Sequence, residues 1–289
     1  MKRILILTVA FVLTLGVAMF AGTNIINALG RQSYTATYSM QVGTMTRTYE
    51  QIAPVAALPR SAPIIVVLSG IAVSVPTEVT RDLLVPYVNT GQAELIYPTG
   101  YKQSWNAGGC CGYAASSDID DVAFLQALVA RVDPGHAHPI YVVGYSNGGR
   151  LAYRMACDYP GLFNGMAVVK AMPMPDCEVS QPLTILQIDS LDDTAVPYRP
   201  GDPGKETPPA TVEVARLRAA DGCSGSSDVA PHSAMTLTTW AKCASGERVG
   251  FAVWNTGGHN FPPPKGNTPG AAAVIWSFFT KTPLAPIPR

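Results

Sequence analysis

The sequence predicts an α/β fold in which a doubly wound, mostly parallel sheet carries an antiparallel N-terminal edge. Short apolar runs alternate with segments of helical spacing, the order that parallel strands joined by crossover helices produce. Most of these runs are continuously apolar, as in strands covered on both faces. The first two candidate strands instead flank Gly43, which is typical of a hairpin turn.

The predicted elements follow in order, without an internal repeat. The predicted strands are residues 34–40, 45–49, 63–68, 94–97, 140–144, 165–169, 183–188 and 249–254. The predicted helices are residues 77–84, 121–132, 148–158, 208–220 and 271–281. Between the fourth strand and the second helix lies a long loop, residues 99–117, and loops of this length in a compact domain are usually functional.

Prolines and capping residues predict where several elements begin and end. Pro86 limits the first helix, Pro98 ends the fourth strand, and Pro160 marks the end of the third helix. Ser117 or Asp118 is expected to cap the second helix, since both side chains can accept a hydrogen bond from a free backbone N–H.

Length and charge restrict the class of protein. The chain has 289 residues, and residues 31–282 have the size of one large catalytic domain, followed by a Pro-rich tail at residues 283–289 that we expect to be loose. The formal net charge is zero, and no run of Lys or Arg forms a basic stripe. Nucleic acid is therefore not an expected partner.

Residues 1–30 are predicted to be a secretory signal peptide or, alternatively, an uncleaved membrane anchor. Lys2 and Arg3 precede an apolar run at residues 4–21, which is the charge and hydropathy pattern of a signal. The run is also close to the shortest length that spans a bilayer. Cleavage would give a secreted protein. Retention would give a periplasmic or cell-envelope protein that meets the membrane only through this segment.

Six cysteines agree with export, because an even number in an exported chain indicates disulfides. They are Cys110, Cys111, Cys157, Cys177, Cys223 and Cys243. In one arrangement Cys157 bonds to Cys177 and Cys223 bonds to Cys243, each pair closing a short local loop. The two adjacent cysteines then bond to each other. Alternatively, the adjacent pair stays as thiols or bonds elsewhere. The sequence contains no C-x-x-C pair of the kind found in zinc sites, so zinc is not expected.

Residues 144–148, Gly-Tyr-Ser-Asn-Gly, match G-x-S-x-G and follow a predicted strand just before a predicted helix. This is the strand-turn-helix setting of the nucleophile elbow in the α/β-hydrolase fold. The turn exposes a serine hydroxyl above the sheet, and the helix N-terminus favours developing negative charge. Ser146 is therefore the candidate nucleophile, and the α/β-hydrolase fold is the expected architecture.

Elimination among four histidines gives the candidate base. His136 and His138 precede the strand that leads to Ser146, so they should lie at the opposite edge of the sheet. His232 lies in a segment without glycine-rich turns and is interpreted as an exposed loop residue. His259 follows the last predicted strand in a glycine-rich loop, which is where this fold carries its base.

The third member of a catalytic triad should follow the strand at residues 183–188, where its carboxylate would orient the imidazole. The candidates are Asp189, Asp192 and Asp193. Asp189 is closest to the strand and is expected to be structural, but spacing alone does not separate the other two.

An oxyanion hole needs two backbone N–H groups directed at the developing charge. The residue after the nucleophile, Asn147, should supply one, and Ile71 in the loop after the strand at residues 63–68 should supply the other. Trp105, Tyr113 and Phe261 are candidates for the lining of an acyl or aryl pocket, with ordinary packing as the alternative role.

Four segments together resemble the secreted polyhydroxybutyrate depolymerase and feruloyl esterase family. They are residues 104–112, Ser-Trp-Asn-Ala-Gly-Gly-Cys-Cys-Gly, and residues 144–149, 193–198 and 257–262. The similarity extends over about residues 45–280. It implies esterase activity on polyesters, aryl esters, or acetylated and feruloylated polysaccharides, and it implies that Asp193, four residues before Pro197, is the acid.

The chain departs from the family pattern in two places. Ser69-Gly70 and Asp189-Ser190 both stand where the family usually has His-Gly. Each change keeps the backbone donors but alters the polarity of the surrounding site.

The expected reaction is acyl transfer through an acyl-enzyme, with an ester, polymeric or small, as the partner and with no metal or organic cofactor. A serine peptidase or an acyltransferase on the same fold is an alternative, since fold alone does not separate these reactions. A non-catalytic secreted binding protein is a further alternative. The oligomeric state is left open.

Overall fold

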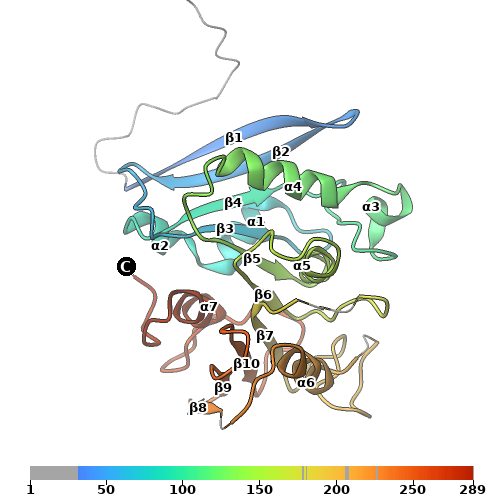
Figure 1. Cartoon of the computed structure of the whole chain (residues 1–289), viewed down its shortest axis with the longest axis vertical. Helices are drawn as coiled ribbons and strands as arrows, with labels where there is room; N and C mark the ends of the chain where they lie inside the picture. Colours follow the sequence, from blue (N-terminus) through green and yellow to red (C-terminus); the bar gives the residue numbers. More distant parts are fainter. Residues whose placement is uncertain (1–31, 178, 180, 206–207, 226, 289) are drawn as a thin grey trace, which may run out of the picture.

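A computed structural model describes residues 32–177, 179, 181–205, 208–225 and 227–288 (Figure 1). The predicted signal peptide or anchor, residues 1–30, lies outside the described residues. Over the described ranges, every helix is too short or too polar to cross a membrane.

One large sheet runs through the described chain in the strand order β1-β2-β4-β3-β5-β6-β7-β10-β9-β8. The strands are β1 Ser33–Val42, β2 Met45–Pro54, β3 Ile64–Leu68, β4 Glu94–Pro98, β5 Ile140–Tyr145, β6 Gly165–Val169, β7 Thr184–Ser190, β8 Asp228–Pro231, β9 Met235–Trp240 and β10 Val249–Trp254. The six strands from β4 to β10 in this order are parallel, and β1 and β2 form the predicted antiparallel edge. The predicted fold class is confirmed.

The sheet has a second antiparallel edge that the sequence analysis missed. β9 pairs antiparallel with β10, and β8 pairs antiparallel with β9. The residues of β8 are all exposed, and in β9 Met235 and Leu237 are buried while Thr236 and Thr238 are half-buried. An edge strand that is half solvated lacks the continuous apolar run by which the central strands were found.

Seven helices are present in the described residues, two more than predicted. They are α1 Val75–Asp82, α2 Val85–Asn89, α3 Gly112–Ser116, α4 Asp121–Val132, α5 Asn147–Asp158, α6 Ala210–Ala220 and α7 Ala271–Thr280. Pro86 lies in the first turn of the short α2, where its missing N–H costs nothing. The cap of α4 is Asp120, whose carboxylate accepts from the Ala123 N–H, so the expectation of Ser117 or Asp118 was wrong.

Two apolar clusters cover the two faces of the sheet. In β3, Ile64, Val66 and Leu68 pack with α4, α5 and α6, whereas Ile65 and Val67 pack with α1, α2 and α7 (Figure 1). This alternation within a fully apolar strand is the expected result of burial on both faces. The C-terminal segment is less loose than expected, because Leu284 and Ile287 pack against the second cluster.

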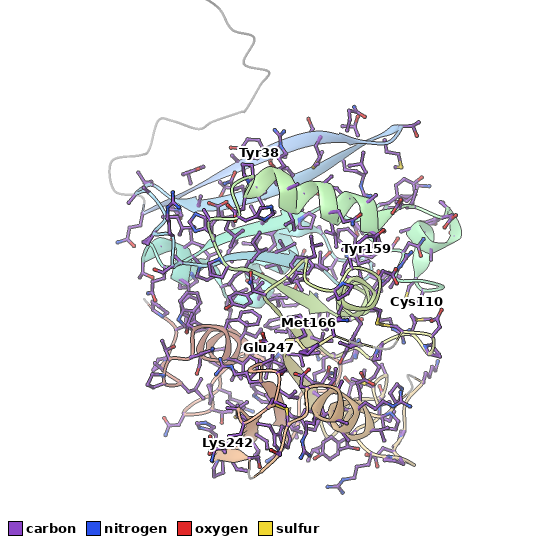
Figure 2. The ribbon with its side chains drawn as sticks, viewed as in Figure 1. Tyr38, Cys110, Tyr159, Met166, Lys242 and Glu247 are labelled. Atoms are coloured by element: carbon purple, nitrogen blue, oxygen red, sulfur yellow. A yellow bond between two sulfur atoms is a disulfide. The ribbon has the colours of Figure 1, made fainter. Side chains whose placement is uncertain are left out.

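Three disulfides join Cys110 to Cys111, Cys157 to Cys177, and Cys223 to Cys243. Cys110 lies on the long loop beside α3 (Figure 2). This is the arrangement of two local loops and one adjacent pair that was considered from the sequence. The reducing environment of a cytosol seldom preserves such bonds.

The strand order reverses its direction at the centre of the sheet. The chain leaves β3 to form β4 on one side and later returns to form β5 on the other. The loops that follow β3 and β5 therefore diverge, and open α/β sheets bind ligands at such a point, outside the carboxyl ends of the strands.

Candidate active site

Ser146 occupies the sharp turn between β5 and α5. Its φ is 51° and its ψ is −117°, a backbone conformation that a residue with a side chain rarely adopts. The turn is tight because α5 approaches the end of β3 closely: a Cβ at Gly148 would lie 2.7 Å from the Ser69 carbonyl oxygen and overlap that of Leu68. Glycine at position 148 therefore permits the turn that exposes the hydroxyl.

The structure brings His259 and Asp193 to this hydroxyl. His259 Nε2 lies 3.0 Å from Ser146 Oγ, and His259 Nδ1 lies 3.0 Å from Asp193 Oδ2. The imidazole is 28% exposed, while the carboxylate is fully buried. The three side chains follow β5, β7 and β10 and form the hydrogen-bonded order of nucleophile, base and acid.

Asp193 is held as an anion. Burial by itself would raise the pKa of its carboxyl, but hydrogen bonds from His259 and from the N–H groups of Ala195 and Val196 outweigh burial and lower the pKa. An ionised carboxylate fixes the orientation of the imidazole and stabilises its protonated form.

Asp192 holds the loop that carries the imidazole. Its carboxylate oxygens accept from the N–H groups of Gly257 at 3.2 Å and Gly258 at 2.8 Å. The two aspartates that spacing alone left open therefore have different contacts: Asp193 meets the ring of His259, and Asp192 meets the backbone just before it.

Tyr145 supports the same loop from the other side. Its hydroxyl donates to the His259 carbonyl oxygen at 2.6 Å, and the Arg81 guanidinium lies 4.7 Å from the centre of its ring. Arg81 also pairs with Glu78 of α1 at 3.4 Å. Burial raises the pKa of Glu78 to about 7, partly countered by Arg81 and the Gly70 N–H. Sequence reasoning missed Tyr145, a variable position of the G-x-S-x-G motif.

The loop after β3 lies next to Ser146. A Cβ at Gly70 would lie 2.8 Å from the ring of Tyr145 and 3.5 Å from Ser146 Cβ. Ile71 is the next residue, and Asn147 begins α5, where the first backbone N–H groups have no partner within the helix. The two predicted oxyanion donors thus belong to segments that flank Ser146.

Trp105 joins these two segments instead of lining a pocket. Its side chain is 0% exposed, its indole N–H donates to the Ser69 carbonyl at 2.9 Å, and its backbone exchanges two hydrogen bonds with the Asn147 amide. Complete burial favours ordinary packing over the pocket lining that was the other role considered for Trp105. Its place behind the oxyanion loop makes it a structural support.

The other two pocket candidates differ from each other. Tyr113 on α3 is 60% exposed, and Lys102 Nζ lies 4.8 Å from the centre of its ring. Phe261 is 5% exposed and packs edge-on against Tyr145. Tyr113 is therefore free to meet a ligand, whereas Phe261 mainly packs beneath the His259 loop.

The remaining histidines lie away from Ser146. His138 Nδ1 contacts the Ala62 carbonyl at 3.1 Å at the amino end of β5, and His136 is exposed nearby. His232 follows β8 and is half-buried, where exposure had been expected. In the described ranges, His, Cys, Asp and Glu side chains nowhere form a group of three suited to a metal ion.

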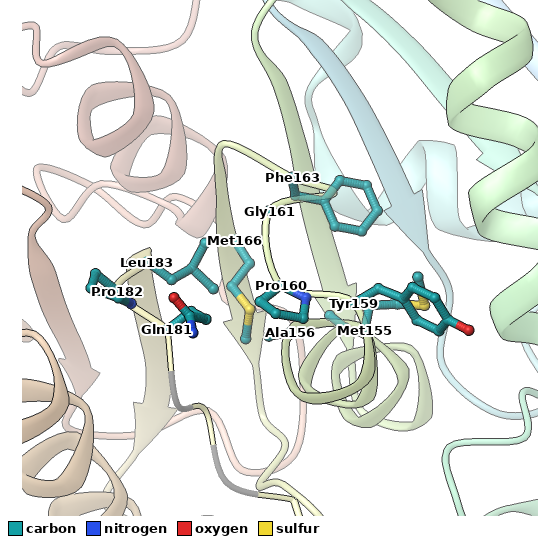
Figure 3. A pocket seen from close by; sticks show the side chains of 11 residues that line it. Met155, Ala156, Tyr159, Pro160, Gly161, Phe163, Met166, Gln181, Pro182 and Leu183 are labelled. Carbon is teal, nitrogen blue, oxygen red and sulfur yellow. The ribbon is translucent and has the colours of Figure 1, made fainter.

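A small apolar cavity of about 20 Å³ lies at the amino edge of the sheet, between the end of α5 and the starts of β6 and β7 (Figure 3). Met155, Tyr159, Phe163, Met166 and Leu183 contribute to its lining. Because the candidate nucleophile is at the carboxyl edge, this cavity is separate from the candidate active site.

The sheet order, the elbow and the linked Ser146, His259 and Asp193 side chains are those of the α/β-hydrolase class. The solved acetyl xylan esterase from Aspergillus awamori superposes with a TM-score of 0.55 at 14% identity over 84% of this chain and 99% of that one, which shows the shared fold. No protein-family profile matches the chain.

One curated relative identifies the family, and a second is more distant. A protein of Nocardia uniformis subsp. tsuyamanensis named as an esterase, NocK, is 31% identical over 248 residues, which cover 76% of this chain and 70% of the relative. A protein designated feruloyl esterase C in Aspergillus niger is 25% identical over 197 residues, 65% of each chain. The chain belongs to this family of serine carboxylic ester hydrolases.

Proposed function

We propose that this protein hydrolyses carboxylic esters through an acyl-enzyme formed on Ser146. The observation that carries the proposal is the continuous hydrogen-bonded chain from Ser146 Oγ through His259 to the buried Asp193 carboxylate. An isolated serine hydroxyl is a weak nucleophile, and a base within hydrogen-bonding distance removes its proton during attack.

The reaction has two steps. In the first, Ser146 Oγ attacks the ester carbonyl while His259 takes its proton, and the N–H groups of Asn147 and Ile71 stabilise the oxyanion. His259 then protonates the departing alcohol. In the second step, His259 takes a proton from water, whose oxygen attacks the acyl carbon, and returns the proton to Ser146 Oγ as the acid leaves. Asp193 orients the imidazole throughout.

The substrates proposed are aryl esters of the feruloyl type, acetyl esters and polyesters. The feruloyl type comes first, because several curated relatives carry the name feruloyl esterase C. The exposed ring of Tyr113 is the candidate contact for an aryl group, since aromatic rings stack favourably.

Substitution of the nucleophile tests the reaction. Ser146→Ala should lower kcat for p-nitrophenyl acetate and methyl ferulate by about 10⁴-fold or more, because the nucleophile of a triad is replaced. Ser39→Ala, on the exposed face of β1, is the matched control and should keep full activity. Equal ester hydrolysis in the Ser146→Ala variant would refute the assignment.

Two further assays separate the alternative functions. Preferred cleavage of the matching p-nitroanilide indicates a peptidase, and ester formation with an added alcohol in place of hydrolysis indicates an acyltransferase. A folded protein that a fluorophosphonate does not label at Ser146 is a binding protein.

The proposal includes export, with residues 1–30 as the exporting segment. The three disulfides support it, because such bonds persist mainly in oxidising compartments. Mass spectrometry of the exported chain tests this: loss of the segment indicates a signal peptide, and retention indicates an anchor.

A further inference from the structure

Lys170 is a fully buried lysine at the carboxyl edge of the sheet, directly after β6. Its side chain is 0% exposed. Its φ is 56°, a left-handed conformation that a residue with a Cβ seldom adopts. Burial of an ammonium group is unfavourable unless charged or polar partners compensate it. The partners of Lys170 therefore indicate why a charge is retained there.

The ammonium group has one hydroxyl partner and faces carboxylates. Lys170 Nζ donates to Ser190 Oγ and lies 3.9 Å from Asp193 Oδ2. The carboxylates that raise its pKa are those of Asp189, Asp193 and Asp192. Burial is the larger influence and lowers the pKa of Lys170 to about 8, so the side chain is still mostly a cation at neutral pH.

The contacts connect this cation to the candidate triad through two routes. Asp193, 3.9 Å from the ammonium, accepts from His259 Nδ1. Ser190 lies beneath the glycine loop, since a Cβ at Gly257 would be 3.4 Å from Ser190 Oγ. Lys170 thus contacts Asp193 directly and, through Ser190, the loop that carries His259.

Without a cation, two buried carboxylates would share this place. Asp189 is 0% exposed at the end of β7, and the Asp193 side chain is equally buried. Two like charges in a buried site favour uptake of a proton by one of them. A protonated Asp193 would stabilise the imidazolium form of His259 poorly.

We propose that Lys170 is a positioning residue of the active site, whose buried ammonium, held by Ser190, keeps Asp193 ionised beside Asp189 and so sets the lower limit of the pH range of activity. This inference rests on the proposed esterase function. Loss of the positive charge would let one of the two buried carboxylates take up a proton at higher pH.

The test is a charge-rescue experiment. Lys170→Met removes the charge while keeping most of the side-chain volume, and Lys170→Met with Asp189→Asn restores the local net charge. Lys242→Met is the control, because Lys242 is exposed on the loop after β9 (Figure 2). We would measure kcat/KM for p-nitrophenyl acetate against pH, per active site labelled by a fluorophosphonate, which removes the effect of any unfolded fraction.

The single variant should move the acid limb of the profile to higher pH by about one unit, the size expected for loss of one nearby charge. On that limb the rate should fall about tenfold, with KM little changed. The double variant should return the limb toward that of the wild type. An unshifted limb in Lys170→Met, or a double variant as impaired as the single one, overturns the proposal and leaves Lys170 a purely structural residue.

If Lys170→Met does not fold, Asp189→Asn alone tests the same idea in the opposite direction. The amide can still accept from Gln187, as Asp189 does at 2.8 Å. With the negative charge of Asp189 removed, the Lys170 cation stabilises the ionised form of Asp193 more strongly. The acid limb should therefore move to lower pH. An unchanged or raised limb overturns the proposal. Failure of the esterase function itself would appear separately, as a wild type without ester hydrolysis or a fully active Ser146→Ala variant.

Discussion

Tyr145 donates its hydroxyl to the backbone carbonyl of His259 at 2.6 Å, so the residue before Ser146 holds the loop that carries His259. Tyr145→Phe should lower kcat by about three- to tenfold, the effect of one neutral hydrogen bond, with little change in KM. Steady-state kinetics on a p-nitrophenyl ester measure both constants.

Tyr141→Phe is the matched control for that variant, because Tyr141 lies on the same strand and donates to the Phe279 carbonyl at 3.3 Å, at the far end of the sheet. It should lose similar stability and keep kcat. Equal kcat in both variants and the wild type would show that the Tyr145 contact does not position His259.

The two adjacent aspartates should differ in their effect on catalysis. Asp193→Asn removes the carboxylate that orients and stabilises the imidazole, so kcat should fall by about 10³-fold or more. Asp192→Asn weakens one of two hydrogen bonds to the glycine loop and should lower kcat by less than about tenfold. Each variant serves as the control for the other, since the two residues are adjacent. A larger loss of kcat in Asp192→Asn than in Asp193→Asn would assign the role of the acid to Asp192.

Trp105 should affect stability and not aryl recognition. Trp105→Phe removes the donor to the buried Ser69 carbonyl, which should lower the free energy of unfolding by about 1–3 kcal/mol. Denaturant unfolding gives this value. The KM for methyl ferulate should stay close to that of the wild type, whereas Tyr113→Ala should raise it if the exposed ring contacts the aryl group. A raised KM only in the Trp105 variant would contradict this placement.

Asp82 should make the protein less stable as the pH rises. Its carboxylate is buried and accepts from the Leu84 N–H and the Tyr97 hydroxyl. Burial raises its pKa from 3.8 to about 8, partly countered by these hydrogen bonds. The folded state therefore retains a proton that the unfolded chain releases. This contribution to stability is fully present below about pH 4 and is lost as the pH rises to about 8.

Asp82→Asn removes that titration while an amide can still accept from Leu84. The free energy of unfolding of the variant, measured in denaturant across this pH range, should fall less with rising pH than that of the wild type. Asp228→Asn, on the exposed strand β8, should follow the wild type. Parallel curves for all three proteins would rule out Asp82 as the source.

The sequence analysis predicted the parts of the fold that repeat a strong local pattern. Continuous apolar runs such as residues 64–68 have few other interpretations, and the elbow at Ser146 is marked by its glycines. The exposed strand β8 and the five-residue helices α2 and α3 have too little apolar periodicity to be seen.

The supporting contacts of the site could not be predicted in the same way. Nothing local shows that Asp192 meets the backbone of Gly257, or that Lys170 is buried beside Asp193, because these partners come from different strands. One signal was available: Asp189-Ser190 departs from the family pattern, and both residues face Lys170. For Trp105 the sequence left pocket lining and ordinary packing open, and the buried partner of its indole N–H favours packing.

The distance along the chain between the reactive groups gives the protein a built-in folding reporter. Ser146 and His259 are 113 positions apart, and His259 and Asp193 are 66 apart, so the proposed mechanism makes the serine reactive only when the central strands have assembled in the right order. A fluorophosphonate added during refolding should therefore label only molecules in which the sheet is complete. The labelled fraction would measure folding without any spectroscopic label.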